Sequence, residues 1–325
     1  MALWMVAART RTPHEWSRRP TPQLLADPVP PFVNDRLLLS NGVHVQLERQ
    51  LGEGRFCRVL RGSTHEGPVA VKVPLDPSHS LEGEAAVLRQ LSGAAGFPRV
   101  YHARHGDPLV LELLGPSMDE LWARTTGGTY FAKATVLRMG CGVLHCLRRL
   151  HLAGFLHNDV KPANVCLGPP SSERAAMVHL IDFGLATPTN QEAAPAASSP
   201  IGTPLFASIA AHQGRPTRAV DDVESLVYSL AFVASGYLPW KQKRHSQTLF
   251  MKQRMMTDGC EVLTDSCAAH GLTEEIHSSS VAEAIQALWA EVVACQETRA
   301  GVDYEKCIAA LGGPSSETVP FEWEL

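Results

Sequence analysis

Three short segments, far apart along the chain, constrain the fold of this protein more than any other feature. They are Val69–Lys72, His157–Asn164 and Ile181–Gly184, with the sequences VAVK, HNDVKPAN and IDFG. Each segment alone is a weak signal. Together they supply a lysine for nucleotide phosphates, an aspartate to orient an attacking hydroxyl, and an asparagine and a second aspartate for Mg²⁺. We therefore expect a fold that brings these side chains together around one triphosphate and its metal.

Composition narrows the class of protein. The chain has 325 residues, of which 45% are hydrophobic and 19% charged, enough for a sizeable core in one large domain or two modest ones. A net charge of −4 argues against a nucleic-acid binder with a basic face. Eight cysteines without a Cys-x-x-Cys pair indicate neither a disulfide framework nor a zinc site, and fit a reducing compartment. No apolar run is long enough to predict a membrane span.

The first 42 residues differ in character from the rest. They are rich in Pro and Arg, and we expect a flexible segment there. Four arginines against one acid in residues 1–26 are a faint mitochondrial-targeting pattern. We interpret the segment as a tail instead, and expect a cytoplasmic or nuclear protein.

Hydrophobic periodicity changes at Val43 and predicts an α+β fold. Alternating apolar residues from Val43, a glycine turn, and further strands at 58–61, 69–73 and 109–113 predict a small antiparallel sheet. Helical spacing follows over 81–91, 135–151, 219–236 and 279–296. The expected organisation is a β-rich lobe over 43–114, a larger and mostly helical lobe over 115–312, and a tail over 313–325.

A glycine-containing turn precedes Lys72. Gly52 and Gly54 lie between two predicted strands, where hairpin N–H groups can donate to phosphates. Cys57 stands where a third glycine is usual, and a Gly-x-Gly hairpin is often only a turn. A lone strand lysine is usually a solvated edge residue. The two features together favour a phosphate site.

The segment around Asp159 predicts the chemistry. Asp159 would accept or orient the proton of the substrate hydroxyl, and Lys161 would neutralise the transferring phosphate. Asn164 and Asp182 carry the oxygens that would ligate Mg²⁺. A surface turn is the alternative interpretation of His-x-Asp, but the residues in series argue against it.

This set resembles the signature of protein kinases. The segments LELLGPSMDEL (111–121) and GTPLFASIAAHQG (202–214) are similar to the casein kinase 1 group, which includes the tau-tubulin and vaccinia-related kinases. The resemblance covers about residues 45–312. It implies the two-lobed kinase fold, ATP and Mg²⁺ as cofactors, protein substrates with a Ser or Thr acceptor, and the adenine hinge at Glu112–Leu114.

The same resemblance assigns further roles. Glu84, rather than the solvent-facing Glu82, would hold Lys72; Thr203 would lie beside Asp159 and Lys161 and help to select Ser/Thr. Asp222 would open a buried helix and hold the backbone of the catalytic loop. The implied nucleotide-binding residues are Leu51, Gly52, Glu53, Gly54, Val59, Ala70, Lys72, Leu111, Glu112 and Leu114.

Two departures from the family pattern carry predictions. Asn158 stands where most kinases have an arginine that pairs with a phosphorylated activation loop, so we expect activity that does not need loop phosphorylation. Ala, Pro and Leu205 replace basic residues near Thr203, so a preference for acidic substrates does not follow. The basic run Lys241, Lys243, Arg244 and His245 is interpreted as a solvated loop, with a substrate contact or a nuclear signal as alternatives.

Two other functions stay open. One is a pseudokinase scaffold, suggested by Asn158 and Cys57. The other is a small-molecule phosphotransferase, against which Lys161 and the Gly202-Thr203 pair argue. The sequence does not define an oligomeric state.

Overall fold

The computed structural model describes residues 36–76, 78–128, 130–170, 172–190, 201–259, 263, 279–313 and 320–321. Residues 1–35 of the expected flexible segment, and most of the expected tail, therefore lie outside the described residues. No helix in the described part of the chain is long and apolar enough to span a membrane.

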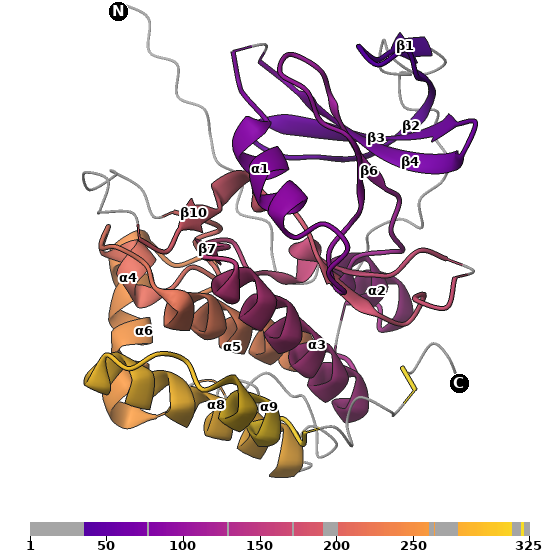
Figure 1. Cartoon of the computed structure of the whole chain (residues 1–325). Helices are drawn as coiled ribbons and strands as arrows, with labels where there is room; N and C mark the ends of the chain where they lie inside the picture. The colour runs from indigo at the N-terminus through magenta and orange to yellow at the C-terminus, as the bar shows by residue number, and fades with distance from the viewer. Residues whose placement is uncertain are drawn as a thin grey trace, which may run out of the picture.

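A six-stranded antiparallel sheet forms the upper lobe in Figure 1, in the order β1-β2-β3-β4-β6-β5. The strands are β1 (Arg36–Leu38), β2 (His44–Glu53), β3 (Cys57–Thr64), β4 (Gly67–Pro74), β5 (Val100–His102) and β6 (Leu109–Glu112).

Strand β1 corrects the sequence-based boundary at residue 43. Leu37 pairs with Val45 on β2, so the sheet begins inside the segment expected to be flexible. Three residues are too few to show a period, and only the pairing with β2 defines this strand.

The sheet has two faces with different roles. The outer face carries a separate apolar cluster made of Leu39, Val45, Leu47, Leu60, Val69, Val71 and Val110. On the opposite face Val59 pairs with Lys72, and Ala70 with Leu111. Because directly paired residues share a face and alternate along each strand, these four side chains lie on the face away from that cluster.

The lower lobe is mostly helical, as predicted. Its helices are α2 (Met118–Thr125), α3 (Lys133–Leu152), α4 (Ile209–His212), α5 (Ala219–Ser235), α6 (His245–Asp258), α8 (Ser279–Thr298) and α9 (Tyr304–Ala310). Helix α5 packs between α3 and α8, and all its residues from Val220 onward are buried (Figure 1). A helix that is buried all round has no polar face, which explains its high hydrophobicity.

Short elements and α1 lie between the two lobes. Strand β7 (Phe155–Leu156) pairs with β10 (Thr187–Pro188), and β8 (Val165–Leu167) pairs with β9 (Val178–Leu180). Two 3₁₀ turns, η2 (Pro162–Asn164) and η3 (Phe183–Leu185), follow in the same region, and α1 (Glu82–Gln90) contacts η3. One core continues from α1 into the helical lobe, and it includes Phe321 from the expected tail. The predicted two-lobed α+β fold is confirmed.

Candidate active site

Lys72 bridges two carboxylates that come from different elements. Its Nζ lies 2.6 Å from Oε2 of Glu84 on α1 and 2.7 Å from Oδ1 of Asp182. Lys72 and Glu84 are both buried. Glu82 is exposed and pairs with His105 instead, so Glu84 is the glutamate that reaches the lysine.

The charges in this trio set one another's pKa values. Burial opposes the charged form of Lys72, but the carboxylates of Glu84 and Asp182 outweigh it and raise the lysine pKa. Burial raises the pKa of Glu84 against the pull of Lys72. Burial also acts against the charge of Asp182, yet Lys72 lowers the pKa of this carboxyl. Lys72 is therefore held as a cation between its two acidic partners.

The backbone at Asp182 is left-handed, with a φ of 66°. The turn is fixed by the next residue, because Phe183 is buried and its ring contacts Phe97 and His157. The side chain of Asp182 is 45% exposed, and Lys72 donates a hydrogen bond only to its Oδ1 atom. The second carboxylate oxygen has no hydrogen bond among the described residues and is free for a metal.

Asp222 holds the catalytic loop from below, as the sequence predicted. Its carboxylate accepts the backbone N–H groups of His157 at 2.7 Å and Asn158 at 2.8 Å. His151 on α3 adds a third contact, 2.8 Å from Nε2 to Oδ2. Burial opposes the charge of Asp222, but these partners outweigh it and lower its pKa. His151 was missed in the sequence, because only the packing of α3 on α5 brings it close.

Asp159, Lys161 and Thr203 form a closed ring of contacts. The ammonium of Lys161 donates to Oδ2 of Asp159 at 2.6 Å and to Oγ1 of Thr203 at 2.8 Å. The N–H of Thr203 donates to Oδ1 of Asp159 at 2.8 Å. The structure thus joins the three residues that the sequence placed at the acceptor hydroxyl.

The donor set fits a hard divalent cation. Asn164 uses its amide nitrogen on the backbone and side chain of Asp159, at 2.9 and 3.2 Å. Its Oδ1 atom makes no hydrogen bond within the described residues. The N–H of Ile181 donates to the carbonyl of Asn164 at 3.0 Å, which places Asn164 next to Asp182 in the fold. An amide oxygen beside a half-exposed carboxylate is the type of site that Mg²⁺ occupies.

Neutral hydrogen bonds tie Asn158 to the segment that follows Asp182. Its side-chain nitrogen donates to the carbonyl of Leu185 and to Oγ1 of Thr187, both at 2.9 Å. Its Oδ1 accepts the hydroxyl of Thr217 at 2.7 Å. Asn158 therefore positions this segment without an added negative charge.

The expected nucleotide-binding residues divide into two groups. Gly52, Glu53 and Gly54 are exposed at the β2–β3 turn, next to Leu51. Val59, Ala70, Lys72 and Leu111 share the inner face of the sheet. The N–H of Leu114 makes no hydrogen bond inside the described chain, which leaves this hinge donor for a ligand.

Glu112 holds the hinge through its side chain, which is not directed at a nucleotide. Arg174, from the loop between β8 and β9, forms an ion pair with its buried carboxylate, which also accepts the N–H of Arg99 at 3.3 Å. The backbone N–H of Glu112 donates to the carbonyl of Arg99 at 2.9 Å, so of this residue only the backbone carbonyl is left for adenine. No local signal marked Arg174, because the contact spans 62 residues.

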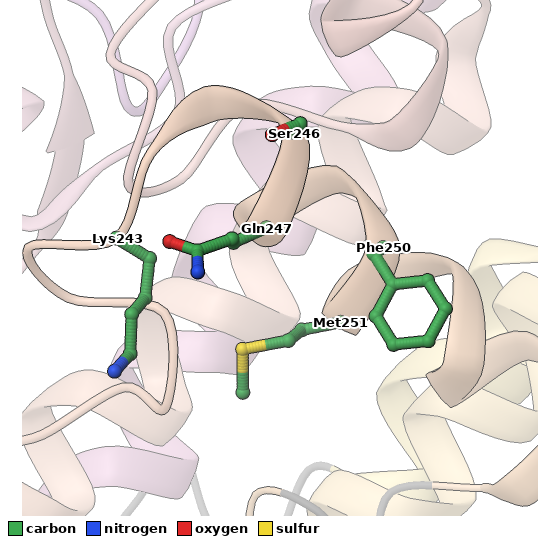
Figure 2. A pocket seen from close by; sticks show the side chains of 5 residues that line it. All are labelled: Lys243, Ser246, Gln247, Phe250 and Met251. Atoms are coloured by element: carbon green, nitrogen blue, oxygen red, sulfur yellow. The ribbon is translucent and has the colours of Figure 1, made fainter.

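A pocket of about 340 Å³ lies elsewhere, on α6. Figure 2 shows Lys243, Ser246, Gln247, Phe250 and Met251 around it. None of them belongs to the set above. The basic run 241–245 is exposed, as expected for a solvated loop.

Comparison with known proteins identifies the domain. The protein kinase domain family matches residues 45–300. Casein kinase 1-like protein HD16 of Oryza sativa subsp. japonica is 35% identical over 268 residues, or 73% of this chain and 37% of that protein. Casein kinase I homolog 2 of Schizosaccharomyces pombe is 32% identical over 213 residues, or 62% and 48%. Casein kinase I homolog RAG8 of Kluyveromyces lactis is 32% identical over 215 residues, or 62% and 39%.

The chain thus spans 37–48% of the length of these relatives. From its fold, its site and these matches, the chain belongs to the protein kinase domain family and is similar to casein kinase 1.

Proposed function

We propose that this protein is a serine/threonine protein kinase that transfers the γ-phosphate of ATP to protein substrates. The observation that carries the proposal is the ring formed by Asp159, Lys161 and Thr203. The Lys72–Glu84 pair and Asp182 supply the second half of such a site.

Each side chain has a chemical role in this scheme. Lys72 is a fixed cation for the nucleotide phosphates, and Glu84 and Asp182 hold it in place. Asp159 accepts the proton of the acceptor hydroxyl, and Lys161 stabilises charge that develops on the transferred group. Mg²⁺ held by Asn164 and Asp182 would neutralise phosphate charge and orient the phosphates.

Lys161 and Thr203 favour a Ser/Thr protein acceptor over a small molecule. Their 2.8 Å contact beside Asp159 builds one wall of the acceptor position. That wall continues into residues 204–207, where the N–H groups of Phe206 and Ala207 donate to the carbonyl of Thr203 and close a turn.

A direct assay tests the proposal. Purified protein with Mg·ATP should phosphorylate members of a degenerate Ser/Thr peptide array, and Asp159→Asn should abolish the signal. A protein that binds ATP but labels no peptide would support the pseudokinase scaffold. Labelling of sugars or aminoglycosides in place of peptides would support the small-molecule phosphotransferase. The cytoplasmic or nuclear location stays a prediction.

A further inference from the structure

Helix α6 carries an inverted pattern of polarity. Its buried positions are Thr248, Lys252 and Met255, which form one stripe along the helix. Lys252 is fully buried, whereas Phe250 is 62% exposed beside the pocket in Figure 2. A lysine in the core and a phenylalanine in solvent reverse the usual preference. The lysine therefore needs a specific reason to lie inside.

Its contacts supply that reason. The ammonium of Lys252 donates to the carbonyls of Pro204 and Leu205, both at 3.2 Å, and of Ala207 at 2.6 Å. These three carbonyls belong to the segment 203–207, which follows directly from the proposed acceptor site. The three N–H groups of the ammonium match these three carbonyls, which lie on one turn of backbone. The same nitrogen also lies 3.3 Å from Nε2 of His212.

Aromatic rings complete the cage around this ammonium. Lys252 Nζ lies 4.5 Å from the ring centroid of Tyr228 and 5.1 Å from that of Trp240. The indole N–H of Trp240 also donates to the carbonyl of Leu205 at 2.8 Å. Burial lowers the pKa of Lys252 to about 7, and the nearby charge of Glu224 opposes that shift. The carbonyls and the two aromatic faces are the contacts that favour the charged form.

Glu224 on α5 holds the other end of the same segment. Its Oε1 accepts the N–H of Ile209 at 2.7 Å and the hydroxyl of Tyr228 at 2.8 Å. Its Oε2 is buried and makes no hydrogen bond within the described residues. Burial, followed by the nearby Asp221, raises the pKa of this carboxyl to about 7, while its two hydrogen bonds and Lys252 act in the opposite direction. Two buried titratable side chains, Lys252 and Glu224, thus hold the backbone of residues 204–209 through hydrogen bonds.

The backbone of segment 203–207 connects the contacts of Lys252 to Thr203. The N–H groups of Phe206 and Ala207 both donate to the carbonyl of Thr203 at 2.9 Å, which closes a tight turn. A shift of Ala207 would therefore move Thr203, and with it the contacts to Asp159 and Lys161.

We propose that Lys252 is a positioning residue for the phosphoryl acceptor, acting through segment 203–207 on Thr203. It touches neither nucleotide nor acceptor. This inference rests on the proposed kinase function. Removing Lys252 should weaken use of the acceptor peptide and leave the nucleotide half of the site unchanged.

The experiment compares Lys252→Met with Arg254→Met, which also replaces a basic residue by Met but on the exposed face of α6, where Arg254 pairs with Asp258. In the full chain, Lys252→Met should lower kcat/KM for the peptide at least tenfold, while KM for ATP and the kinetics of Arg254→Met stay at wild-type values. A wild-type peptide kcat/KM in Lys252→Met would overturn the proposal, as would an equal loss for ATP and peptide.

A second variant separates positioning from folding. Lys252→Met/Glu224→Gln removes both buried charges and should recover thermal stability relative to Lys252→Met. Peptide kcat/KM should stay low in this variant, because the carbonyls of segment 203–207 still lack their donor. If peptide kcat/KM recovers along with thermal stability, Lys252 only stabilises the fold, and the proposal is overturned. If Lys252→Met does not fold, the double variant decides.

A further measurement does not depend on catalysis. Hydrogen exchange at the amides of Phe206 and Ala207 should accelerate in the double variant, while the amides of β4 keep their wild-type rates. Unchanged exchange at both amides would contradict the inference even if the wild-type chain phosphorylates nothing, in which case the proposed function alone would fail.

Discussion

The carboxylate of Asp222 accepts the backbone N–H of Asn158 at 2.8 Å across 64 residues of sequence. The same carboxylate takes the N–H of His157. Both oxygens of the Asp222 carboxylate are needed as acceptors, because the two backbone N–H groups that they bind fix the loop that carries Asp159. We expect Asp222→Asn to lower kcat by roughly ten- to a hundredfold, equivalent to the loss of about 1.5–3 kcal/mol for a hydrogen bond to a charged group. Steady-state kinetics measure this change.

Asp107→Asn is the matched control for that variant. Asp107 also accepts a backbone N–H, that of Ser40 at 3.2 Å, and lies in the turn between β5 and β6. Its replacement should leave kcat unchanged. Wild-type kcat in Asp222→Asn would show that the loop keeps its shape without this carboxylate.

Lys72→Met should remove activity and destabilise the fold at once. It leaves Glu84 buried without its cation, and breaking a buried ion pair costs about 3–5 kcal/mol. Loss of the phosphate contact should lower kcat/KM on the order of a hundredfold or more. The double variant Lys72→Met/Glu84→Gln should regain most of the melting temperature and none of the activity. Thermal melting and a phosphorylation assay separate the two effects, and activity in the double variant would remove Lys72 from the mechanism.

Activity should not depend on phosphorylation of the segment after Asp182. The side chain of Asn158 already ties Leu185, Thr187 and Thr217 together through neutral bonds. We expect the alanine variant of Thr187, Thr189, Ser198 and Ser199 to keep the wild-type rate, because Asn158 loses only its bond to Thr187 Oγ1 and keeps those to Leu185 and Thr217. Ser198 and Ser199 lie outside the described residues. Dephosphorylated and untreated protein should have equal rates.

Asn158→Gly provides the opposite control. Glycine keeps the left-handed backbone at this position, where φ is 66°, and removes all three side-chain bonds. The rate should fall in this variant. A rate loss in the alanine variant with none in Asn158→Gly would instead point to a phosphorylated residue as the organiser.

Acid should destabilise the protein through His212. Burial, followed by the nearby charge of Lys252, lowers the pKa of His212 from 6.5 to about 4. As pH falls from about 6.5 to about 4, the unfolded chain takes up this proton and the folded chain does not. The free energy of unfolding should therefore fall by up to about 3 kcal/mol over this window. Denaturant melts at several pH values measure the slope.

His212→Gln should reduce that slope specifically. Glutamine offers an N–H for the Pro204 carbonyl, which lies 3.0 Å from Nε2 of His212, and it does not titrate. The contributions of Glu224 and other carboxyls are common to both proteins and cancel in the comparison. Identical slopes in wild type and variant would contradict the assignment to His212.

Local patterns were sufficient for much of the fold. The expected helix over 81–91 is α1 (Glu82–Gln90), and the expected helix over 135–151 is α3 (Lys133–Leu152). Both have a clear apolar stripe, which depends only on near neighbours in sequence. The side chains of the three segments Val69–Lys72, His157–Asn164 and Ile181–Gly184 also lie together, as expected. The order of a strand, a loop and a turn along the chain limits the number of ways in which it can fold.

Contacts that depend on packing were not predictable. Arg174 reaches Glu112 across 62 residues, and β1 exists only because β2 lies beside it. Lys252 sits in a stretch, LFMKQRMM, where a lysine normally marks the solvent face. Only the arrangement of α5, α6 and residues 204–207 turns it inward.

The left-handed backbone shared by Asn158 and Asp182 limits which sequences this scaffold can accept. Side chains with a branched Cβ are excluded at both positions by steric clash, whatever their chemistry. A saturation library at residue 158 should therefore lack Val, Ile and Thr among folded clones. At residue 182, clones with Asn or Gly should also fold, because both residues preserve the turn. These clones should fail any selection that demands turnover.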